Sequence, residues 1–292
     1  MKMMIFLKYI QLLKPLIDPG APTSQNSQDK SVKKVLKRPD FLLPFRQKAP
    51  MILRAQQTIY SEKDRLRTSE GFSNILMYRG VLYGSSYATH DVRWFNTLHE
   101  WQQYYTNSKE KNKDIDKYFV NICAYGFNNK ARSVDCIAEY WIQNKRWTSF
   151  IERNPNIAKV YAFLTAKKSK KEEFKKVFPN IGPLTALLIC GDLIEAGVME
   201  MPSIKEWAHL VFKVGKGAAE GLIRLNLLPR KYSEDQIFQA FDGLHRFLLE
   251  NISDADRALM GYNIIMLEHG LCKFTRLTKQ KQKQESEKKL KV

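Results

Sequence analysis

The sequence predicts a mainly α-helical protein. Three segments carry apolar residues at the 3.6-residue spacing of an amphipathic helix, namely 204–212, 236–249 and 258–274. Sustained alternation of polar and apolar residues is absent, and only the segment 75–83 has a strand-like composition. Hydrophobic residues make up 44% of the chain and aromatic residues 12%, which is enough for a folded core and excludes global disorder.

The remaining segments complete the predicted organisation. We expect a short amphipathic helix at 3–16, and the aromatic-rich segments 90–105 and 133–150 also look helical. Composition divides the chain into three regions. Residues 1–40 are a basic N-terminal segment that includes a linker at 18–40, and residues 279–292 are a basic tail. Residues 41–278 form a helical domain with a sub-boundary at the wholly polar stretch 106–118, and its second half, 160–278, contains the most informative turn.

Charge and cysteine usage narrow the class of protein. The chain has 48 Lys and Arg against 30 Asp and Glu, a net charge of +18, which favours a polyanionic partner such as DNA. The four cysteines have no CxxC spacing, so the sequence predicts no metal site, and it predicts no cofactor. No stretch approaches the roughly 20 apolar residues of a membrane span. We therefore expect an intracellular protein without a membrane partner, nuclear if the organism is eukaryotic.

The most informative segment is the turn Phe178-Pro179-Asn180-Ile181-Gly182-Pro183-Leu184-Thr185-Ala186. A Lys-rich helix is expected before it, at 167–176, and an apolar helix after it, at 187–196. Pro183 suits a first helical turn, and Gly182 lets another molecule approach the backbone. The amides at a helix start attract phosphate. The predicted phosphate contacts are Lys167, Lys168, Asn180, Gly182 and Thr185, and the alternative is an ordinary turn between helices.

A second glycine-rich turn, Gly215-Lys216-Gly217, is a further candidate phosphate site. Arg224 follows it and could add a bidentate phosphate donor. An ordinary flexible turn is the alternative interpretation of the two glycines.

Two carboxylates are candidate catalytic groups. Asp192 shares a helix face with Thr185 and is expected to point inward, as a general base or as a structural partner of Arg224 or Lys216. Glu268 is adjacent to His269, and the two could relay protons. His269 by itself is more typical of a core histidine, whereas a buried carboxylate needs a reason.

The turn at 178–186 resembles the helix-hairpin-helix of the DNA glycosylase superfamily, which grips the DNA backbone. The catalytic Asp that this resemblance implies, roughly 20 residues beyond the glycine, is absent, because the chain has Glu200-Met201-Pro202-Ser203-Ile204 there. Base excision by the usual route is therefore not expected.

Three motifs in order resemble a narrower group, the α-glutamyl/putrescinyl thymine pyrophosphorylase family. They are Asp192-Leu193, the run from Gly215 to Leu225, and Leu267-Glu268-His269-Gly270-Leu271-Cys272-Lys273-Phe274. The resemblance covers about residues 165–278, and Phe72, Asn74 and Arg79 faintly resemble the family's F-x-N-x-x-x-R element. Lys273 stands where the family tends to have an acidic residue, which is typical of a divergent member.

This resemblance implies a glycosylase-like enzyme of thymine hypermodification. Such an enzyme would transfer an amino acid or polyamine onto pyrophosphorylated 5-hydroxymethyluracil in DNA, with catalytic candidates Asp192, Glu268 and His269. Two alternatives stay open, a non-catalytic DNA-binding protein on the same scaffold and a base-excision glycosylase. Whether the protein is an enzyme is left undecided by the sequence.

Overall fold

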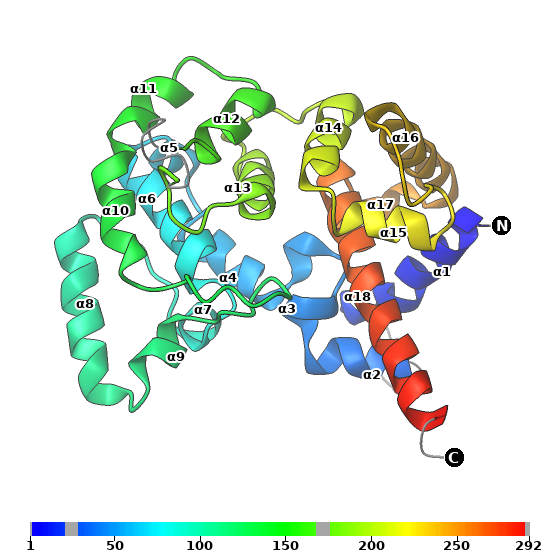
Figure 1. Cartoon of the computed structure of the whole chain (residues 1–292), viewed down its shortest axis with the longest axis horizontal. Helices are drawn as coiled ribbons and strands as arrows, with labels where there is room; N and C mark the ends of the chain where they lie inside the picture. Colours follow the sequence, from blue (N-terminus) through cyan, green and yellow to red (C-terminus); the bar gives the residue numbers. More distant parts are fainter. Residues whose placement is uncertain (1, 21–28, 168–175, 290–292) are drawn as a thin grey trace. The chain divides into compact units, whose positions relative to one another are not determined.

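The computed structural model describes residues 2–20, 29–167 and 176–289 and confirms the mainly helical prediction. Within these ranges the only β-type pairing is a single bridge between Lys167 and Lys176. None of the described helices is both long and apolar enough to cross a membrane. Contacts divide the chain into two units: unit 1 comprises Met1–Ile52 with Ser203–Val292, and unit 2 comprises Leu53–Pro202 (Figure 1).

Unit 1 is organised around its last helix, α18 (Ile264–Lys289), which packs against α15 (Ala218–Arg224). Phe274 of α18 contacts Phe6 and Tyr9 edge-on, with ring centroids 5.8 and 5.3 Å apart. The unit's other helices are α1 (Lys2–Leu13), α2 (Lys30–Lys37), α3 (Pro39–Leu42), α14 (Ile204–Val214), α16 (Glu234–Asn251) and α17 (Asp254–Met260).

The N-terminal segment differs from the expected linker. The predicted helix at 3–16 is present as α1, and its buried Phe6 and Ile10 belong to the core of unit 1. Residues 30–37, expected in the linker, form α2, because the Asp29 side chain accepts hydrogen bonds from the first amides and Val32 is buried. The Pro/Ser-rich residues 21–28 lie outside the described residues.

The C-terminal half of unit 1 follows the predicted periodicity with one break. The segments 204–212 and 236–249 form α14 and α16, each of which begins with a capping box. The segment 258–274 is not one helix, since Gly261 adopts a left-handed conformation (φ 62°) between α17 and α18. The helix α18 continues to Lys289, into the predicted tail.

Unit 2 is built on an aromatic core around α6 (Ser69–Met77). Phe72 stacks on Trp147 with ring centroids 4.2 Å apart, and the Trp147 indole donates to the Leu66 carbonyl at 2.9 Å. The unit's other helices are α5 (Lys63–Leu66), α7 (Ser86–His90), α8 (Leu98–Lys111), α9 (Ile115–Phe119), α10 (Cys136–Gln143), α11 (Trp147–Ile151), α12 (Ile157–Leu164) and α13 (Pro183–Glu195), while α4 (Pro50–Thr58) spans the division between the units.

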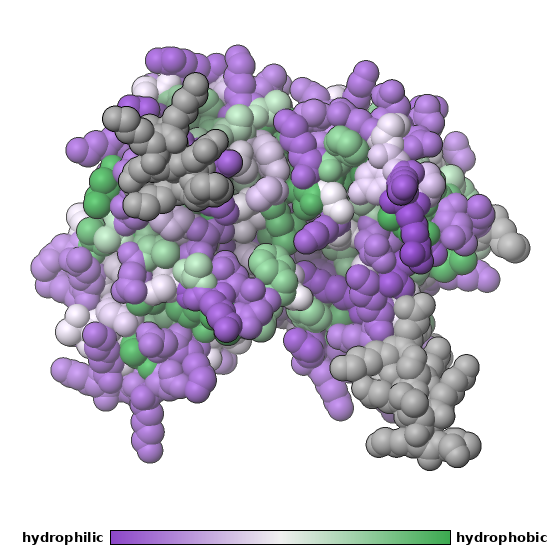
Figure 2. Space-filling model, in the orientation of Figure 1, coloured by the Kyte–Doolittle hydropathy of each residue, from purple (hydrophilic) through white to green (hydrophobic). Residues whose placement is uncertain are grey.

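Several details of unit 2 differ from expectation. The strand-like segment 75–83 is helical, and residues Tyr78–Leu82 form a π-helix. The aromatic segment 90–105 becomes helical only at Leu98, where Thr97 caps α8. The polar stretch 106–118 covers the end of α8 and most of α9, whereas the contacts divide the chain at 52/53 and 202/203. Figure 2 shows that hydrophilic side chains predominate on the visible face.

Two glycines of unit 1 give a matched test of the α15–α18 packing. A Cβ at Gly221 would lie 2.8 Å from the Leu271 carbonyl oxygen, whereas at Gly243 the nearest atom is the flexible end of Met3 at 3.7 Å. We expect Gly221→Ala to destabilise the protein by about 2 kcal/mol through overpacking. Gly243→Ala should stabilise α16 by up to about 1 kcal/mol. Urea unfolding measures the free energy of unfolding of both variants. Equal changes in the two variants would contradict the close packing of α15 on α18.

Candidate functional site

Contacts with the core of unit 2 fix the conformation of the turn before α13. Ile181 is buried, the Tyr140 hydroxyl donates to the Pro179 carbonyl at 2.5 Å, and Asn180 adopts a left-handed conformation (φ 62°). The Asn180 amide donates to the Cys136 sulfur at 3.2 Å and accepts from Asn129 at 3.3 Å. The turn thus has fixed geometry, although the side chain of Asn180 is already engaged within the protein.

The N-terminus of α13 has a cation beside it. Gly182 is the N-cap residue and has no side chain to cap the first amides, and Pro183 opens the helix as predicted. The Lys176 ammonium lies 3.1 Å from the position that a Cβ of Gly182 would occupy, and partial burial lowers the pKa of Lys176. Because a helix N-terminus is itself positive, these two groups together favour an anion.

Two further features surround the turn. Thr185, a predicted phosphate contact, is buried in the first turn of α13. On the Cys136 side, Asp135 and Glu139 both act to raise the pKa of the Cys136 thiol, after the larger effect of burial. The electrostatic environment of the turn is therefore positive at Gly182 and bordered by two carboxylates beyond Cys136.

The Lys-rich helix expected at 167–176 is not observed at Lys167 or Lys176, the two residues of that range that the structure describes. The helix α12 ends at Leu164, and Lys167 instead pairs with Lys176 in an antiparallel bridge. The Val177 amide donates to the Ala166 carbonyl at 2.9 Å, which closes this pairing. Residues 168–175, including the predicted contact Lys168, lie outside the described residues. The helix after the turn is thus confirmed, whereas a helix-hairpin-helix is not.

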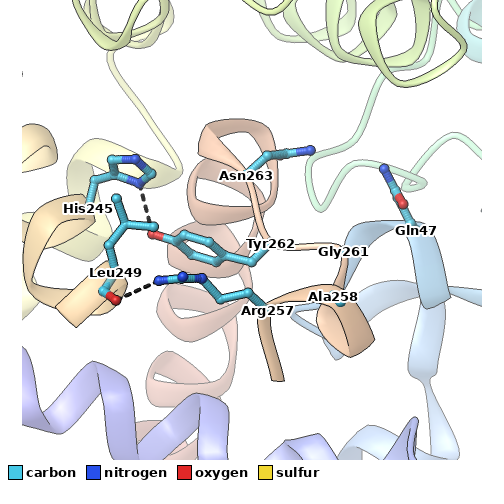
Figure 3. A pocket seen from close by; sticks show the side chains of 8 residues that line it. All are labelled: Gln47, His245, Leu249, Arg257, Ala258, Gly261, Tyr262 and Asn263. Atoms are coloured by element: carbon cyan, nitrogen blue, oxygen red, sulfur yellow. Dashed lines mark hydrogen bonds between the residues drawn. The ribbon is translucent and has the colours of Figure 1, made fainter. Parts of the chain in front are cut away.

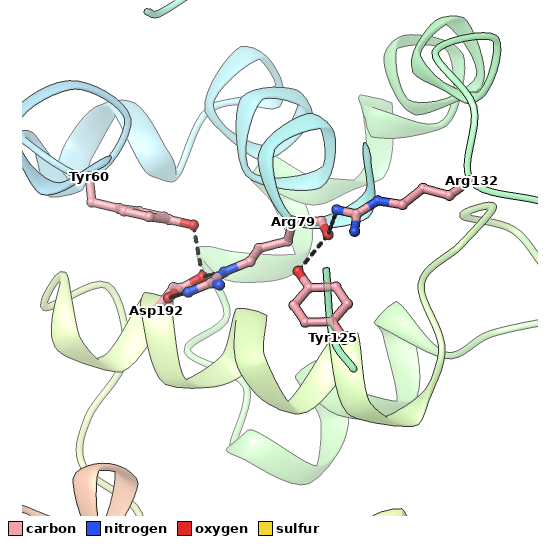
Figure 4. A network of polar contacts seen from close by, with 5 residues as sticks. All are labelled: Tyr60, Arg79, Tyr125, Arg132 and Asp192. Atoms are coloured by element: carbon pink, nitrogen blue, oxygen red, sulfur yellow. Dashed lines mark hydrogen bonds and ion pairs between the residues drawn. The ribbon is translucent and has the colours of Figure 1, made fainter. Parts of the chain in front are cut away.

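Asp192 points into unit 2 and is part of a buried ion pair (Figure 4). Arg79 donates to both carboxylate oxygens, from Nε at 2.5 Å and from Nη2 at 2.6 Å, and Tyr60 donates at 2.7 Å. The side chains of Arg79 and Asp192 are 1% and 2% exposed. Burial is the largest single effect and lowers the pKa of Arg79, but the charge and hydrogen bonds of Asp192, with Tyr60 and Tyr125, together raise it well above its usual value. The carboxylate thus has donors on both oxygens and is inaccessible to solvent.

Arg79 is positioned by the π-helix. The Tyr83 amide donates to the Tyr78 carbonyl at 2.7 Å, and the Arg79 carbonyl accepts from Tyr125 at 2.7 Å and from Arg132 at 3.2 Å. Arg79 stands one residue further from Asn74 than in the F-x-N-x-x-x-R element. A π-helix contains one residue more than the α-helical turn that it replaces, so its wider turn accommodates this extra residue.

Glu268 and its neighbours lie in unit 1. Glu268 and His269 are 4% and 8% exposed, and the Cys272 thiol donates to Glu268 at 3.0 Å. Burial raises the pKa of Glu268, against the smaller opposing effects of Cys272 and of nearby cations, Arg46 among them. Lys273, at the departure from the family motif, is also buried; its amine donates to the Asp40 carbonyl at 2.8 Å. Asp192 and Glu268 thus belong to different units, each within its own core.

The second glycine-rich turn has a packing role. Gly215 ends α14 in a left-handed conformation (φ 63°), and a Cβ at Gly217 would overlap the Cys272 sulfur. Arg224 pairs with Glu220 at 3.2 Å, so its guanidinium is partly neutralised. Of this predicted site, Gly215 and Lys216 are exposed, and Lys216 is the one with a charged side chain in the turn. Sequence reasoning missed Lys176 and Tyr60, because no local pattern distinguishes either residue.

Two pockets lie away from the predicted catalytic residues. One in unit 1, of about 460 Å³, includes the hydrogen-bonded pair His245 and Tyr262, 2.9 Å apart, and burial lowers the pKa of His245 (Figure 3). A larger one in unit 2, of about 780 Å³, has Arg132 and Asn121 in its wall. Neither is lined by a predicted catalytic residue. Among the described residues, no group of three or more His, Cys, Asp or Glu side chains is placed to hold a metal ion.

The buried ion pair predicts strongly coupled substitutions. Asp192→Asn should destabilise the protein by about 3 kcal/mol or more, since it leaves the Arg79 charge buried without a partner. The double variant Arg79→Met with Asp192→Leu should cost much less than the sum of the single changes, whereas Tyr60→Phe should cost only about 1 kcal/mol. Denaturant unfolding of the wild type, the single variants Arg79→Met and Asp192→Leu, and their double variant measures this coupling, and additive effects would show that no such pair exists in solution.

Comparisons of the chain with protein-family models, with curated proteins and with solved structures give no match. The resemblance to the thymine pyrophosphorylase family therefore stays a prediction from motifs. The mainly helical architecture is established, and what the protein does has to follow from the geometry and charge of its own residues.

Proposed function

We propose that this protein binds DNA, and that it grips the sugar-phosphate backbone at the turn before α13. The observation that carries the proposal is the Lys176 ammonium beside the uncapped N-terminus of α13 at Gly182. Amides and an ammonium recognise phosphate oxygens without reading bases, so this contact would be independent of sequence. The net charge of +18 adds long-range attraction to a polyanion.

Electrostatics explains why an anion suits this turn. The N-terminus of a helix carries a partial positive charge, and an ammonium beside it is repelled unless a negative group lies between them. Burial is the cause of the lowered pKa of Lys176. A bound phosphate would neutralise both positive groups and restore the pKa of Lys176 toward its usual value.

The geometry supports binding better than catalysis. A general base must reach a proton on its substrate, and Asp192 is saturated by Arg79 and Tyr60 within the core of unit 2. Glu268 is likewise buried, in unit 1. Base excision has no further support, because the carboxylate expected beyond the turn is missing.

One observation favours the alternative function, group transfer to a modified thymine with an amino acid or polyamine as co-substrate. Arg79, from the F-x-N element, and Asp192, from the helix after the turn, are two residues that the family resemblance singles out independently. They form one ion pair, with Arg79 Nε 2.5 Å from Asp192. A shared active-site scaffold would bring them together, although a shared structural core would do so equally well.

Charge reversal at the turn tests the binding proposal. Lys176→Glu should weaken DNA binding for all sequences alike, and the slope of log Kobs against log salt should become shallower by about 1. Fluorescence anisotropy with a labelled duplex at several salt concentrations gives both values. Lys145→Glu, an equal charge change at an exposed residue of unit 2, is the control. Salt-independent binding, or equal losses in both variants, would count against the turn as the contact.

A nucleoside assay separates the two functions. The protein would be incubated with hydroxymethyluracil-containing DNA, activated by pyrophosphorylation, together with amino acids or polyamines. We expect the nucleosides to be unchanged by mass spectrometry, because neither candidate base is accessible. An adduct that disappears in Asp192→Asn, measured where that variant is still folded, would instead establish the transferase.

A further inference from the structure

Most of the excess charge lies in unit 1. Residues 1–52 and 203–292 contain 26 Lys and Arg against 14 Asp and Glu, so this unit has a net charge of +12 out of the total of +18. The turn before α13 belongs to unit 2 and accounts for none of this surplus. Unit 1 therefore needs its own explanation for such a strong positive charge.

The helix α2 concentrates lysines on one exposed face. Lys30, Lys33 and Lys37 are all exposed and stand at i, i+3 and i+7, while Val32 and Val35 are buried on the opposite face. At 1.5 Å per residue the three lysines extend over about 10 Å, which is the rise of roughly three nucleotides along one strand of DNA. The neighbouring acidic residue, Asp29, caps the first amides of α2 and offsets one of these three positive charges.

The positive surface continues onto the helices that α2 packs beside. The helix α3 contacts both α2 and α18. Its Phe41 ring makes cation–π contacts with the guanidinium groups of Arg38 and Arg276, each 4.4 Å from the ring centroid. Lys279, one turn beyond Arg276 on α18, has a side chain that is 58% exposed, and its ammonium lies 3.9 Å from the Glu220 carboxylate. Asp40 of α3 accepts the Met51 amide at 2.7 Å and contributes one negative charge near these cations.

We propose that the surface of Lys30, Lys33, Lys37, Arg38, Arg276 and Lys279 is a second nucleic-acid interface, which binds the phosphate backbone through unit 1. Ammonium and guanidinium groups are the donors that phosphate oxygens prefer, and a guanidinium can bind phosphate through two hydrogen bonds. A nucleic acid fits better than an anionic membrane. Among the described side chains of α2, α3 and α18, Leu36 is the one large apolar residue that is strongly exposed, too little to insert into a bilayer.

The interface is tested with the full chain and a triple variant, Lys30→Glu, Lys33→Glu and Lys37→Glu. Its matched control reverses three exposed lysines of unit 2, Lys111, Lys113 and Lys145. Anisotropy with a labelled duplex should show roughly tenfold weaker binding for the α2 variant at physiological salt, and a salt slope shallower by about 3. The control should lose much less. Charge reversal could unfold α2, so circular dichroism verifies the helix content of each variant. A milder triple variant, Lys→Gln at the same three residues, removes the charges without reversing them.

The outcomes separate this interface from the turn before α13. A loss in the α2 variant with the Lys176→Glu effect intact supports an independent second interface, whatever the fate of the turn. Equal losses in the α2 variant and its control would overturn the proposal, as would an unchanged salt slope. Vesicles containing phosphatidylserine provide the other test: α2-dependent binding to vesicles, without α2-dependent binding to duplex, would assign the surface to a membrane and overturn it too.

Discussion

The buried ion pair between Arg79 and Asp192 is the constraint on which the arrangement of unit 2 depends. Two charges removed from water are tolerated only with close partners, so the π-helix and α13 are fixed in one relative position. Asp192 lies ten residues after Gly182, about 15 Å along α13. The Tyr140 hydroxyl holds the other end through the Pro179 carbonyl. A helix fixed at both places presents its N-terminus without first losing conformational freedom, which favours phosphate binding.

Local patterns predicted the elements whose structure is determined locally. The helices α14 and α16 follow from apolar periodicity and capping boxes, and the start of α13 follows from Gly182 and Pro183. The partner of Asp192 did not follow, because Arg79 is 113 residues away and the expected partners were Arg224 and Lys216. The π-helix was also missed, since its aromatic and β-branched residues are equally typical of a strand. Pairings of distant charges leave no periodic trace in one sequence.

Packing explains why the motifs of the family resemblance occur together. Gly217 lies against the Cys272 sulfur, and Gly221 lies against the Leu271 carbonyl, so the glycine-rich run and the Glu-His-x-x-Cys segment form one contact between α15 and α18. Thr275 adds a hydrogen bond to the Gly217 carbonyl at 3.3 Å. A pair of motifs that serve one helix crossing is expected in any chain with that crossing. Their joint presence in this chain is therefore explained by packing and does not require a shared reaction.

Several acidic residues have structural roles in the fold. Asp29 and Asp40 accept backbone amides, and Asp192 is consumed by Arg79, so these carboxylates are committed to holding the fold. Lys30, Lys33 and Lys37 of α2, in contrast, are exposed to solvent. Contacts of this kind supply affinity through counterion release but distinguish no base. Asn129 and Asn180, the amide side chains near the turn, are hydrogen-bonded to each other, so the DNA contact that we propose there would not read base edges through them.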